Sequence, residues 1–244
     1  MDDMRRSLKE TDAWWTVIVT DPISVRLLFL IANKTWITPN EISLSAIFLV
    51  SISAFFFTQG SYLWLVVGAL IWQTSYVLDC IDGKLARLKN EETKTGYLLE
   101  AFHSQIEGSI CPIALAYGQF ARTGDFTYVI LLSIALIVFN TWFFMAIMPE
   151  KIKNTQFTTK TISTYANEKN NMIYILAKKY LQIKEKFKKH RLDPLPTGVE
   201  ALVTLCFVAP LLFLIKVGLI LYILLWLFVL VYTIIFRLFT KYCS

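Results

Sequence analysis

Long apolar stretches alternate with short polar connections along most of this chain. The stretches run for about 20 residues, the length at which an α-helix crosses the hydrocarbon core of a bilayer. The predicted fold class is therefore an all-α integral membrane protein, with residues 1–244 in one membrane domain. The pattern predicts six transmembrane helices, at about 41–58, 62–82, 96–120, 126–148, 198–215 and 217–236.

A shorter apolar run precedes the first of these spans. Asp21-Pro22 has the form of a helix start, with the Asp as the cap and the Pro in the first turn. The run from Pro22 to about Asn33 contains Arg26 and is too short to span a bilayer. It predicts an N-terminal amphipathic helix that lies in the membrane interface, anchored by tryptophans. These tryptophans are Trp14, Trp15 and Trp36.

The composition favours a membrane protein over a soluble domain. Apolar residues make up 56% of the 244 positions, and the mean hydropathy is +0.54. The first ten residues are charged, and no short apolar segment with a cleavage site follows them, so no cleaved signal peptide is expected. The four cysteines have neither disulfide nor zinc-site spacing and are interpreted as packing residues.

The basic residues predict how the spans are oriented. Of the 24 Lys and Arg, 22 lie before the first span, after the last span, or in the connections that follow the second and fourth spans. The two in the other connections are Arg122 and Lys216. By the positive-inside rule, both termini and the connection between the second and third spans face the cytoplasm.

The segment 150–197 is a long basic loop on the same, cytoplasmic side. From Met172 to His190, apolar residues recur at three- and four-residue steps, which predicts a basic amphipathic helix at an anionic membrane surface. A solvated basic face explains the pattern equally well. Nucleic acid is not an expected partner, since no recognition module accompanies the charges. The basic residues concerned are Lys184, Lys186, Lys188, Lys189 and Arg191.

Candidate chemistry is concentrated where the second apolar stretch ends and the third begins. Residues three or four apart share one face of a helix, and one such set comprises Asp79, Asp82, Gly83 and Ala86. Two carboxylates one turn apart can bind a divalent cation, and the small residues let a phosphate approach the backbone. Arg87 follows and can bind phosphate oxygens bidentately. A second set shares a face of the next helix: Glu100, His103, Ser104 and Glu107.

These residues resemble the signature of the CDP-alcohol phosphotransferase family, integral-membrane enzymes that build phospholipid head groups. The family motif reads D-x-x-D-G-x-x-A-R, then eight residues, then G-x-x-x-D-x-x-x-D. The third and fourth Asp of the motif are replaced here by Glu100 and Ser104. The positions that match the motif, with its eight-residue gap, are Asp79, Asp82, Gly83, Ala86, Arg87 and Gly96.

The resemblance implies a set of ligands. Asp79, Asp82 and Glu100 would bind two divalent cations, Mg²⁺ or Mn²⁺, shared with the diphosphate of a CDP-linked donor. The acceptor would be a lipid or a small polar molecule, and the chain would form a homodimer among membrane lipids. For Thr38 and Asn40, a role in capping the first span is the alternative. The nucleotide and phosphate contacts would come from Gly83, Ala86, Arg87, Asn40 and Thr38.

The fourth Asp of the family is placed to take the proton of the acceptor hydroxyl, and Ser104 has no useful basicity near neutral pH. Three outcomes follow: a neighbour replaces the base, an acceptor that is already ionised needs none, or catalysis is lost. The first is favoured because His103 is adjacent to Ser104 and Glu107 lies one turn away. The alternatives are that His103 is a neutral histidine satisfied by a neighbouring helix, and that Glu107 is an outer ligand or pairs with a buried basic residue. For Glu200, at the start of the fifth span, a cap is the expected role and acceptor binding is the alternative.

The function that these residues predict is transfer of a substituted phosphate from a CDP-linked alcohol to an acceptor, with release of CMP. The alternative is a degenerate, non-catalytic member of the family that binds nucleotide or lipid. A polyprenyl-type transferase ranks last, because such enzymes need a second Asp-rich motif on a later helix and the sequence has none.

Overall fold

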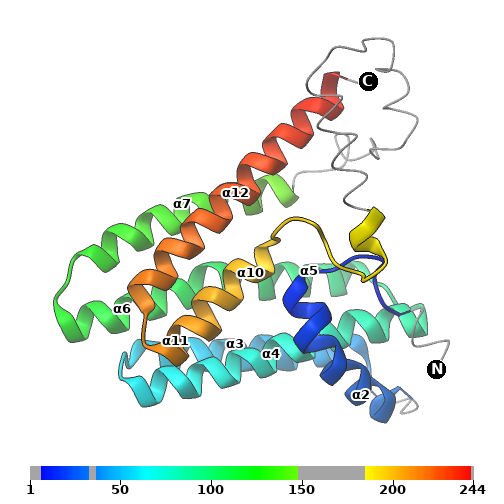
Figure 1. Ribbon diagram of the computed structural model, residues 1–244. Coiled ribbons are helices and arrows are strands. Elements are labelled where there is room, and N and C mark those ends of the chain that lie inside the picture. The colour runs from blue at the N-terminus through cyan, green and yellow to red at the C-terminus, as the bar shows by residue number, and fades with distance from the viewer. Residues whose placement is uncertain (1–6, 33–36, 148–184, 243–244) are drawn as a thin grey trace.

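The computed structural model describes residues 7–32, 37–147 and 185–242, with side chains as far as residue 234. Nearly all of these residues are helical (Figure 1). The described part contains no β-strand beyond one isolated bridge between Asp12 and Leu192. The predicted all-α class is confirmed. The amphipathic helix predicted at 172–190 begins outside the described residues.

The N-terminal helix begins earlier than the sequence predicts. Residues 14–15 are already helical, and the chain continues through the π-helical turn η1 (Thr16–Thr20) into α2 (Asp21–Ile31). Asp21 has helical dihedral angles and does not cap the helix, so the prediction of an Asp21 cap is wrong, although Asp21 is the first residue of α2 and Pro22 lies in its first turn. The wider turn of η1 explains this, because it accommodates Pro22 without ending the helix.

α3 (Pro39–Thr58) and α4 (Tyr62–Lys89) form an antiparallel pair joined by a tight turn at Gly60. Gly60 has a φ of +63°, in the left-handed region that favours glycine. The helix α6 (Cys111–Thr123) approaches this turn closely at Gly118, where a Cβ would lie 2.3 Å from the carbonyl oxygen of Phe57. α4 continues past its predicted end at residue 82, so the whole first half of the motif lies on one helix.

A second π-helical turn lies inside the third long helix. η2 (Ile106–Ile110) connects α5 (Lys94–Gln105) to α6 (Cys111–Thr123) directly ahead of Pro112. Proline has no N–H, and its ring collides with the carbonyl four residues earlier in a regular helix. The π turn relieves this collision, so the helix runs on from 94 to 123.

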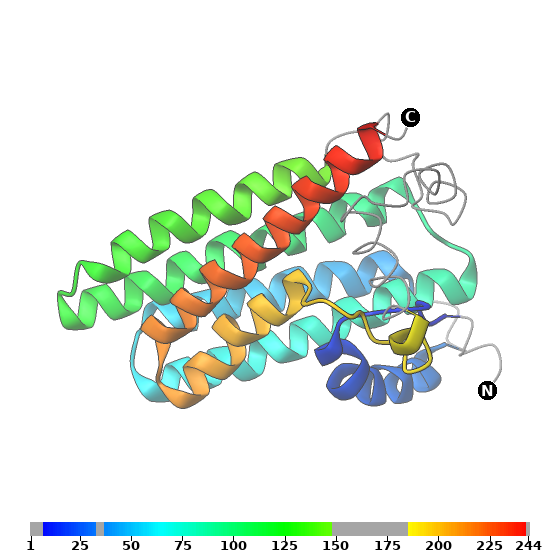
Figure 2. The same ribbon diagram turned by 45° about the horizontal axis from the view of Figure 1, so that its top comes forward.

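The remaining helices complete the bundle. α7 (Thr127–Ile147) packs against α12 (Ile215–Tyr242), and α12 also contacts a shorter helix made of α10 (Gly198–Val203), η3 (Thr204–Val208) and α11 (Ala209–Leu212). The third π turn, η3, again comes just before a proline. Figure 2 shows α12 running diagonally between α7 and this shorter helix.

Four of the described helices are long and apolar enough to cross a membrane: α3, α4, α7 and residues 215–234 of α12. The unit formed by α10, η3 and α11 is apolar but shorter. The chain is thus a helical membrane protein, and the count of six spans stays a prediction.

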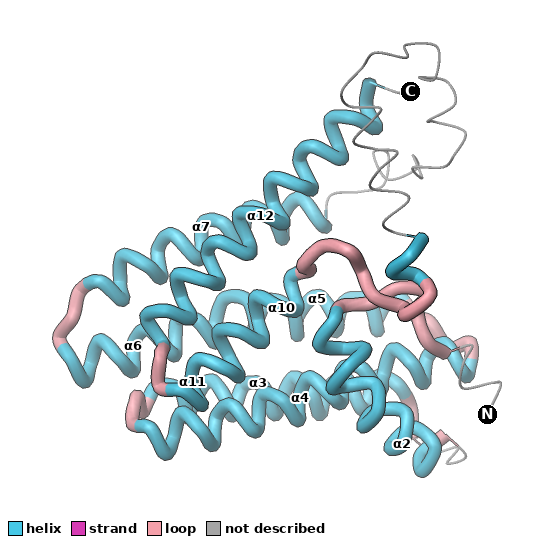
Figure 3. The backbone as a smooth tube through the Cα atoms, viewed as in Figure 1, coloured by secondary structure: helices cyan, strands magenta, loops and turns pink. Residues whose placement is uncertain are grey.

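The two ends of the bundle differ. Short loops join α3 to α4, α6 to α7 and α11 to α12 at one end (Figure 3). The N-terminal segment, the connection from α4 to α5 and residues 189–197 lie at the other end (Figure 3). Aromatic side chains fill much of the core between these ends: Phe57, Trp72, Phe139, Tyr222 and Trp226.

Candidate active site

A cavity of about 670 Å³ lies where α4 ends and α5 begins. Its volume falls in the range of sites for small molecules. α4, α5 and the N-terminal segment supply most of its charged residues, whereas α7, α10 and α12 supply apolar and aromatic ones. The cavity therefore has a charged outer end and an aromatic inner end.

Most of the predicted site residues line this one cavity. Two do not, namely Thr38 and His103. Thr38 instead caps α3: its side chain accepts a hydrogen bond from the Glu41 N–H, and the Glu41 carboxylate accepts one from the Thr38 N–H. The alternative of a capping role is thus confirmed for Thr38. The predicted residues on the cavity wall are Asn40, Asp79, Asp82, Gly83, Ala86, Arg87, Glu100, Ser104 and Glu107.

His103 is 2% exposed and lies behind the cavity wall. Its Nδ1 is 3.2 Å from Oδ1 of Asp79 and 3.7 Å from Oε2 of Glu107. Its Nε2 is 2.9 Å from the Ser75 hydroxyl, which donates its own proton to the carbonyl of Ala46. Nε2 must therefore donate to Ser75, and a hydrogen bond from Nδ1 to Asp79 makes both ring nitrogens donors. This geometry is that of an imidazolium between two carboxylates.

Glu107 lies on the cavity wall and is 4% exposed. It is part of η2, the turn that Pro112 imposes on the helix. The carbonyl of Gly108, four residues before that proline, accepts a hydrogen bond of 2.8 Å from the Tyr222 hydroxyl, and Pro112 has no N–H to offer it. The π turn that presents Glu107 to the cavity is thus anchored to α12.

Asp82 is positioned by a residue that the sequence analysis did not identify. The Ser43 hydroxyl on α3 donates to Oδ2 of Asp82 at 2.5 Å, and Ser43 also lines the cavity. Asn40 lies one turn earlier on α3, with its Oδ1 facing the backbone of Gly96. The sequence did contain a signal for Ser43: it lies three residues after Asn40, and this spacing places both residues on one face of α3.

Arg87 extends along the cavity wall past Gly83. Its Nε donates to the backbone carbonyl of Ser7 at 2.7 Å, and a Cβ on Gly83 would lie 3.4 Å from its Nη1. A side chain at Gly83 would thus begin in ordinary van der Waals contact with the guanidinium. The hydrogen bond to Ser7 also ties the N-terminal segment to the motif helix.

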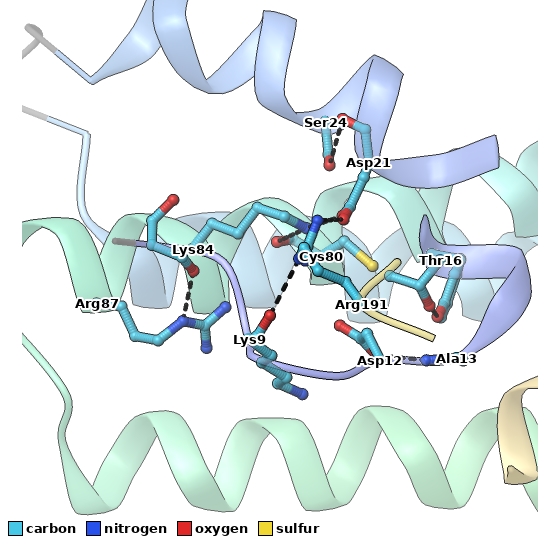
Figure 4. A network of polar contacts seen from close by, with 12 residues as sticks. Lys9, Asp12, Ala13, Thr16, Asp21, Ser24, Cys80, Lys84, Arg87 and Arg191 are labelled. Atoms are coloured by element: carbon cyan, nitrogen blue, oxygen red, sulfur yellow. Dashed lines mark hydrogen bonds and ion pairs between the residues drawn. The ribbon is translucent and has the colours of Figure 1, made fainter. Parts of the chain in front are cut away.

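A buried ion pair fixes the N-terminal helix to α4. Lys84 Nζ lies 2.9 Å from Oδ1 of Asp21, and both side chains are less than a tenth exposed. Arg191 Nη1 lies 2.9 Å from the other oxygen of Asp21, and Arg191 Nε donates to the carbonyl of Lys9 (Figure 4). No sequence pattern indicated this network, since it joins three distant segments.

The same network brings the N-terminal segment onto the cavity, whose wall includes Lys9 and Asp12. The Asp12 N–H donates to the Arg191 carbonyl, and the Asp193 N–H donates to the Asp12 carbonyl. Outside the membrane segments, the Glu10 carboxylate accepts a hydrogen bond from Lys188 and raises the pKa of that ammonium. Two segments far apart in the sequence therefore meet beside the site.

Carboxylates from two helices provide oxygen donors for a divalent cation, since Asp79 and Asp82 on α4 and Glu100 on α5 line the same cavity. Such hard oxygen donors suit Mg²⁺ and Mn²⁺. Within the described residues, no group of three or more His, Cys, Asp or Glu is close enough to hold an ion together. The donor chemistry fits a divalent cation, while two of the carboxylates are engaged by His103 and Ser43.

Glu200 caps the helix that begins at Gly198, as the sequence predicts. Its Oε2 accepts hydrogen bonds from the Thr197 N–H and hydroxyl, and the Thr197 Oγ1 accepts one from the Val199 N–H. Its Oε1 accepts one from the Trp14 N–H. Both oxygens of Glu200 are thus used structurally.

The fold and the cavity define a helical membrane protein with a cavity lined by acidic and basic side chains at one end of its bundle. The chain belongs to the CDP-alcohol phosphatidyltransferase family, whose model matches residues 36–239. The N-terminal segment and α2 lie outside this match. Members of the family are transferases, and the motif residues lie within the matched range.

Two relatives with curated names come from Helicobacter pylori, and each is named CDP-diacylglycerol--serine O-phosphatidyltransferase. The protein of strain ATCC 700392 / 26695 is 30% identical over 118 residues, which cover 44% of this chain and 47% of the relative. The protein of strain J99 / ATCC 700824 is 29% identical over 118 residues, which again cover 44% of this chain and 47% of the relative. The chain thus spans about half the length of these relatives.

Proposed function

We propose that this protein transfers a substituted phosphate from a CDP-linked alcohol to a hydroxyl-bearing acceptor in phospholipid or related phosphodiester synthesis. The observation that carries the proposal is the meeting of both halves of the motif on one cavity wall. The acceptor oxygen forms a bond to the donor's second phosphorus, and the bond from that phosphorus to the oxygen of CMP breaks. The products are the new phosphodiester, CMP and one proton.

The donor binds at the outer end of the cavity, where the basic side chains gather. Arg87 and the small residues Gly83 and Ala86 lie there, and a planar guanidinium suits the oxygens of a diphosphate. Asn40 lies on the facing helix and contacts the nucleotide. Thr38 is left with its capping role, since it is not on the cavity wall.

Glu107 takes the proton that the acceptor hydroxyl loses. Glu107 lines the cavity one turn from Ser104, whereas His103 lies behind the wall with both ring nitrogens donating. A doubly protonated ring cannot accept a proton, so His103 positions the carboxylates of Asp79 and Glu107. The Ser104 hydroxyl contacts the acceptor at the position where the family has its fourth Asp.

Asp79, Asp82 and Glu100 would hold two divalent cations, Mg²⁺ or Mn²⁺. Cations there would stabilise negative charge on the transferred phosphoryl group and on the departing CMP. The proposal also includes a homodimer. Both termini and the site face the cytoplasm, because 22 of the 24 basic residues fall on that side of the predicted spans.

The test is CMP release by purified protein in lipid nanodiscs, with CDP-diacylglycerol and L-serine as the first substrate pair and Mn²⁺ present or absent. We expect release that depends on the metal and is abolished in Asp82→Asn. The competing candidate is a non-catalytic binding protein, which Ser104 favours because it lacks the family's base. Tight CDP-diacylglycerol binding with no CMP release from any CDP donor would support that candidate instead.

A further inference from the structure

The N-terminal segment, which comprises residues 7–13, forms one side of the cavity although it lies outside the range 36–239 that matches the family model. It supplies one basic residue, Lys9, to the cavity wall. The other basic residues on the wall are Lys84 and Arg87, both on α4. Lys9 is thus a cation that this chain brings to the site from outside the part that it shares with the family.

The backbone around Lys9 is anchored on both sides. The Ser7 carbonyl accepts a hydrogen bond of 2.7 Å from Arg87 Nε, and the Lys9 carbonyl accepts one of 3.1 Å from Arg191 Nε. Three residues further on, the Asp12 N–H donates to the Arg191 carbonyl at 2.9 Å. The main chain therefore holds Lys9 at the cavity while its side chain stays exposed, as a preorganised binding group requires.

The two lysines on the wall differ in what their ammonium groups contact. Lys84 Nζ lies 2.9 Å from Asp21 and donates to the carbonyl of Cys80, so its charge is already neutralised. The Lys9 ammonium makes no ion pair or hydrogen bond with the side chains that the structure describes. In Figure 4 the Lys9 side chain points away from Arg191 and Asp21, toward the pale green helix that contains α5. Lys9 therefore offers the cavity a positive charge that no other contact uses.

This charge is placed where a phosphate would need it. Acidic residues outnumber basic ones on the cavity wall, so a diphosphate can bind only beside cations. The Lys9 ammonium interacts electrostatically with the carboxylates of Asp79 and Glu100, which are candidate metal ligands on α4 and α5. A lysine in that position can bind phosphate oxygens as a compact point charge.

We infer that Lys9 binds the second phosphate of the CDP-linked donor, the one that is transferred. That phosphate must lie beside the carboxylates that would hold the cations, and the charge of Lys9 acts on two of them. The anchored N-terminal segment keeps the ammonium in place for this contact. The inference rests on the proposed function, because it adds a donor-binding residue to that reaction.

The experiment measures the binding of CDP and of CMP to the purified full chain in nanodiscs with Mn²⁺, by calorimetry. CDP carries the second phosphate, and CMP lacks it. Lys9→Met keeps the backbone carbonyl that Arg191 binds but removes the charge. We expect it to weaken CDP binding about tenfold or more, because a hydrogen bond to a charged group is lost, and to leave CMP binding unchanged.

Two further variants separate a phosphate contact from a structural role. Lys9→Arg keeps the positive charge and should retain most of the CDP affinity. Lys189→Met removes a lysine that is exposed and off the cavity wall, so it is the matched control and should bind both nucleotides normally. Normal CDP affinity in Lys9→Met would overturn the inference, as would an equal loss of CDP and CMP binding.

CMP release from CDP-diacylglycerol, measured in the same preparations, distinguishes this failure from that of the proposed function. Normal CDP affinity in Lys9→Met together with intact CMP release would leave the transferase and remove the role of Lys9. CDP binding that depends on Lys9, without CMP release from any CDP-linked donor, would leave the phosphate contact and remove the transfer reaction.

Discussion

His103 joins Asp79 to Glu107, because its Nδ1 lies 3.2 Å from the first carboxylate and 3.7 Å from the second. The ring is held from its other side by Ser75. One buried side chain thus connects a candidate metal ligand on α4 with the candidate base in η2. A change at His103 should therefore affect both groups, although His103 itself does not reach the cavity.

We predict that His103→Ala lowers both the stability and the metal affinity of the protein. Removing one partner from a buried charged contact costs about 3–5 kcal/mol of folding stability. Thermal unfolding in detergent and Mn²⁺ calorimetry measure the two effects. His190→Ala removes the other histidine, which is exposed, and serves as the control. A variant at His103 with normal melting temperature and normal Mn²⁺ affinity would argue against the linking role.

Helical periodicity explains which parts of the site the sequence could predict. Asp79, Asp82 and Ala86 face the same cavity because residues three and four apart share a helix face, and this holds for Glu100 and Ser104 too. His103 was grouped with them, but a position adjacent to Ser104 is turned by about 100° and points behind the wall. The periodicity of α5 alone does not show that Ser75 and Asp79 of α4 contact His103 and hold it behind the cavity wall.

Contacts between distant segments were not predictable in the same way. Asp21 looked like a helix cap, because Asp-Pro usually starts a helix. In the structure a π turn accommodates Pro22, and Asp21 is left to pair with Lys84 and Arg191. Both basic partners lie in other elements, so only the packing of three segments brings these charges together.

The metal ligands give the second prediction. Asp79→Asn, Asp82→Asn and Glu100→Gln should each weaken Mg²⁺ and Mn²⁺ binding, because each removes one anionic oxygen ligand. Calorimetry with the metal alone measures this, and Asp125→Asn at the opposite end of the bundle is the control. Unchanged affinity for both metals in all three variants would mean that these carboxylates do not bind a cation.

Arg87→Lys tests the phosphate contact. The substitution keeps the charge but loses the planar fork, so we expect weaker binding of the CDP-linked donor. It also removes the hydrogen bond from Nε to the Ser7 carbonyl. Binding of CDP-diacylglycerol is the measurement, and Lys94→Met, at an exposed position at the start of α5 and off the cavity wall, tests for an effect of surface charge alone. Donor affinity equal to that of the unmodified protein would rule out a bidentate contact.

The ion pair under the N-terminal helix should contribute strongly to stability. Asp21→Ala leaves Lys84 buried without its carboxylate, which we expect to cost about 3–5 kcal/mol. The exposed pair of Glu10 and Lys188 offers a contrast, and Glu10→Ala should leave the melting temperature unchanged. Thermal unfolding of the two variants side by side provides the comparison. Similar melting temperatures for both variants would show that the buried Asp21 pair stabilises the fold no more than the exposed Glu10 pair does.

The final prediction concerns the vacancy at Ser104. If Glu107 is the base, Glu107→Gln should lower turnover by tenfold or more, since general-base assistance contributes about 10²–10⁴ in rate. Ser104→Asp restores a carboxylate at the position where the family has one, on the same cavity wall. We therefore expect the double variant Ser104→Asp/Glu107→Gln to recover part of the lost rate. Ser104→Asn in the Glu107→Gln background has a similar size without the basicity, and should recover none.

Normal turnover in Glu107→Gln would exclude a shifted base, and an acceptor that is already ionised would then explain activity better. Recovery by Asn as well as by Asp would mean that the added side chain improves packing rather than proton transfer.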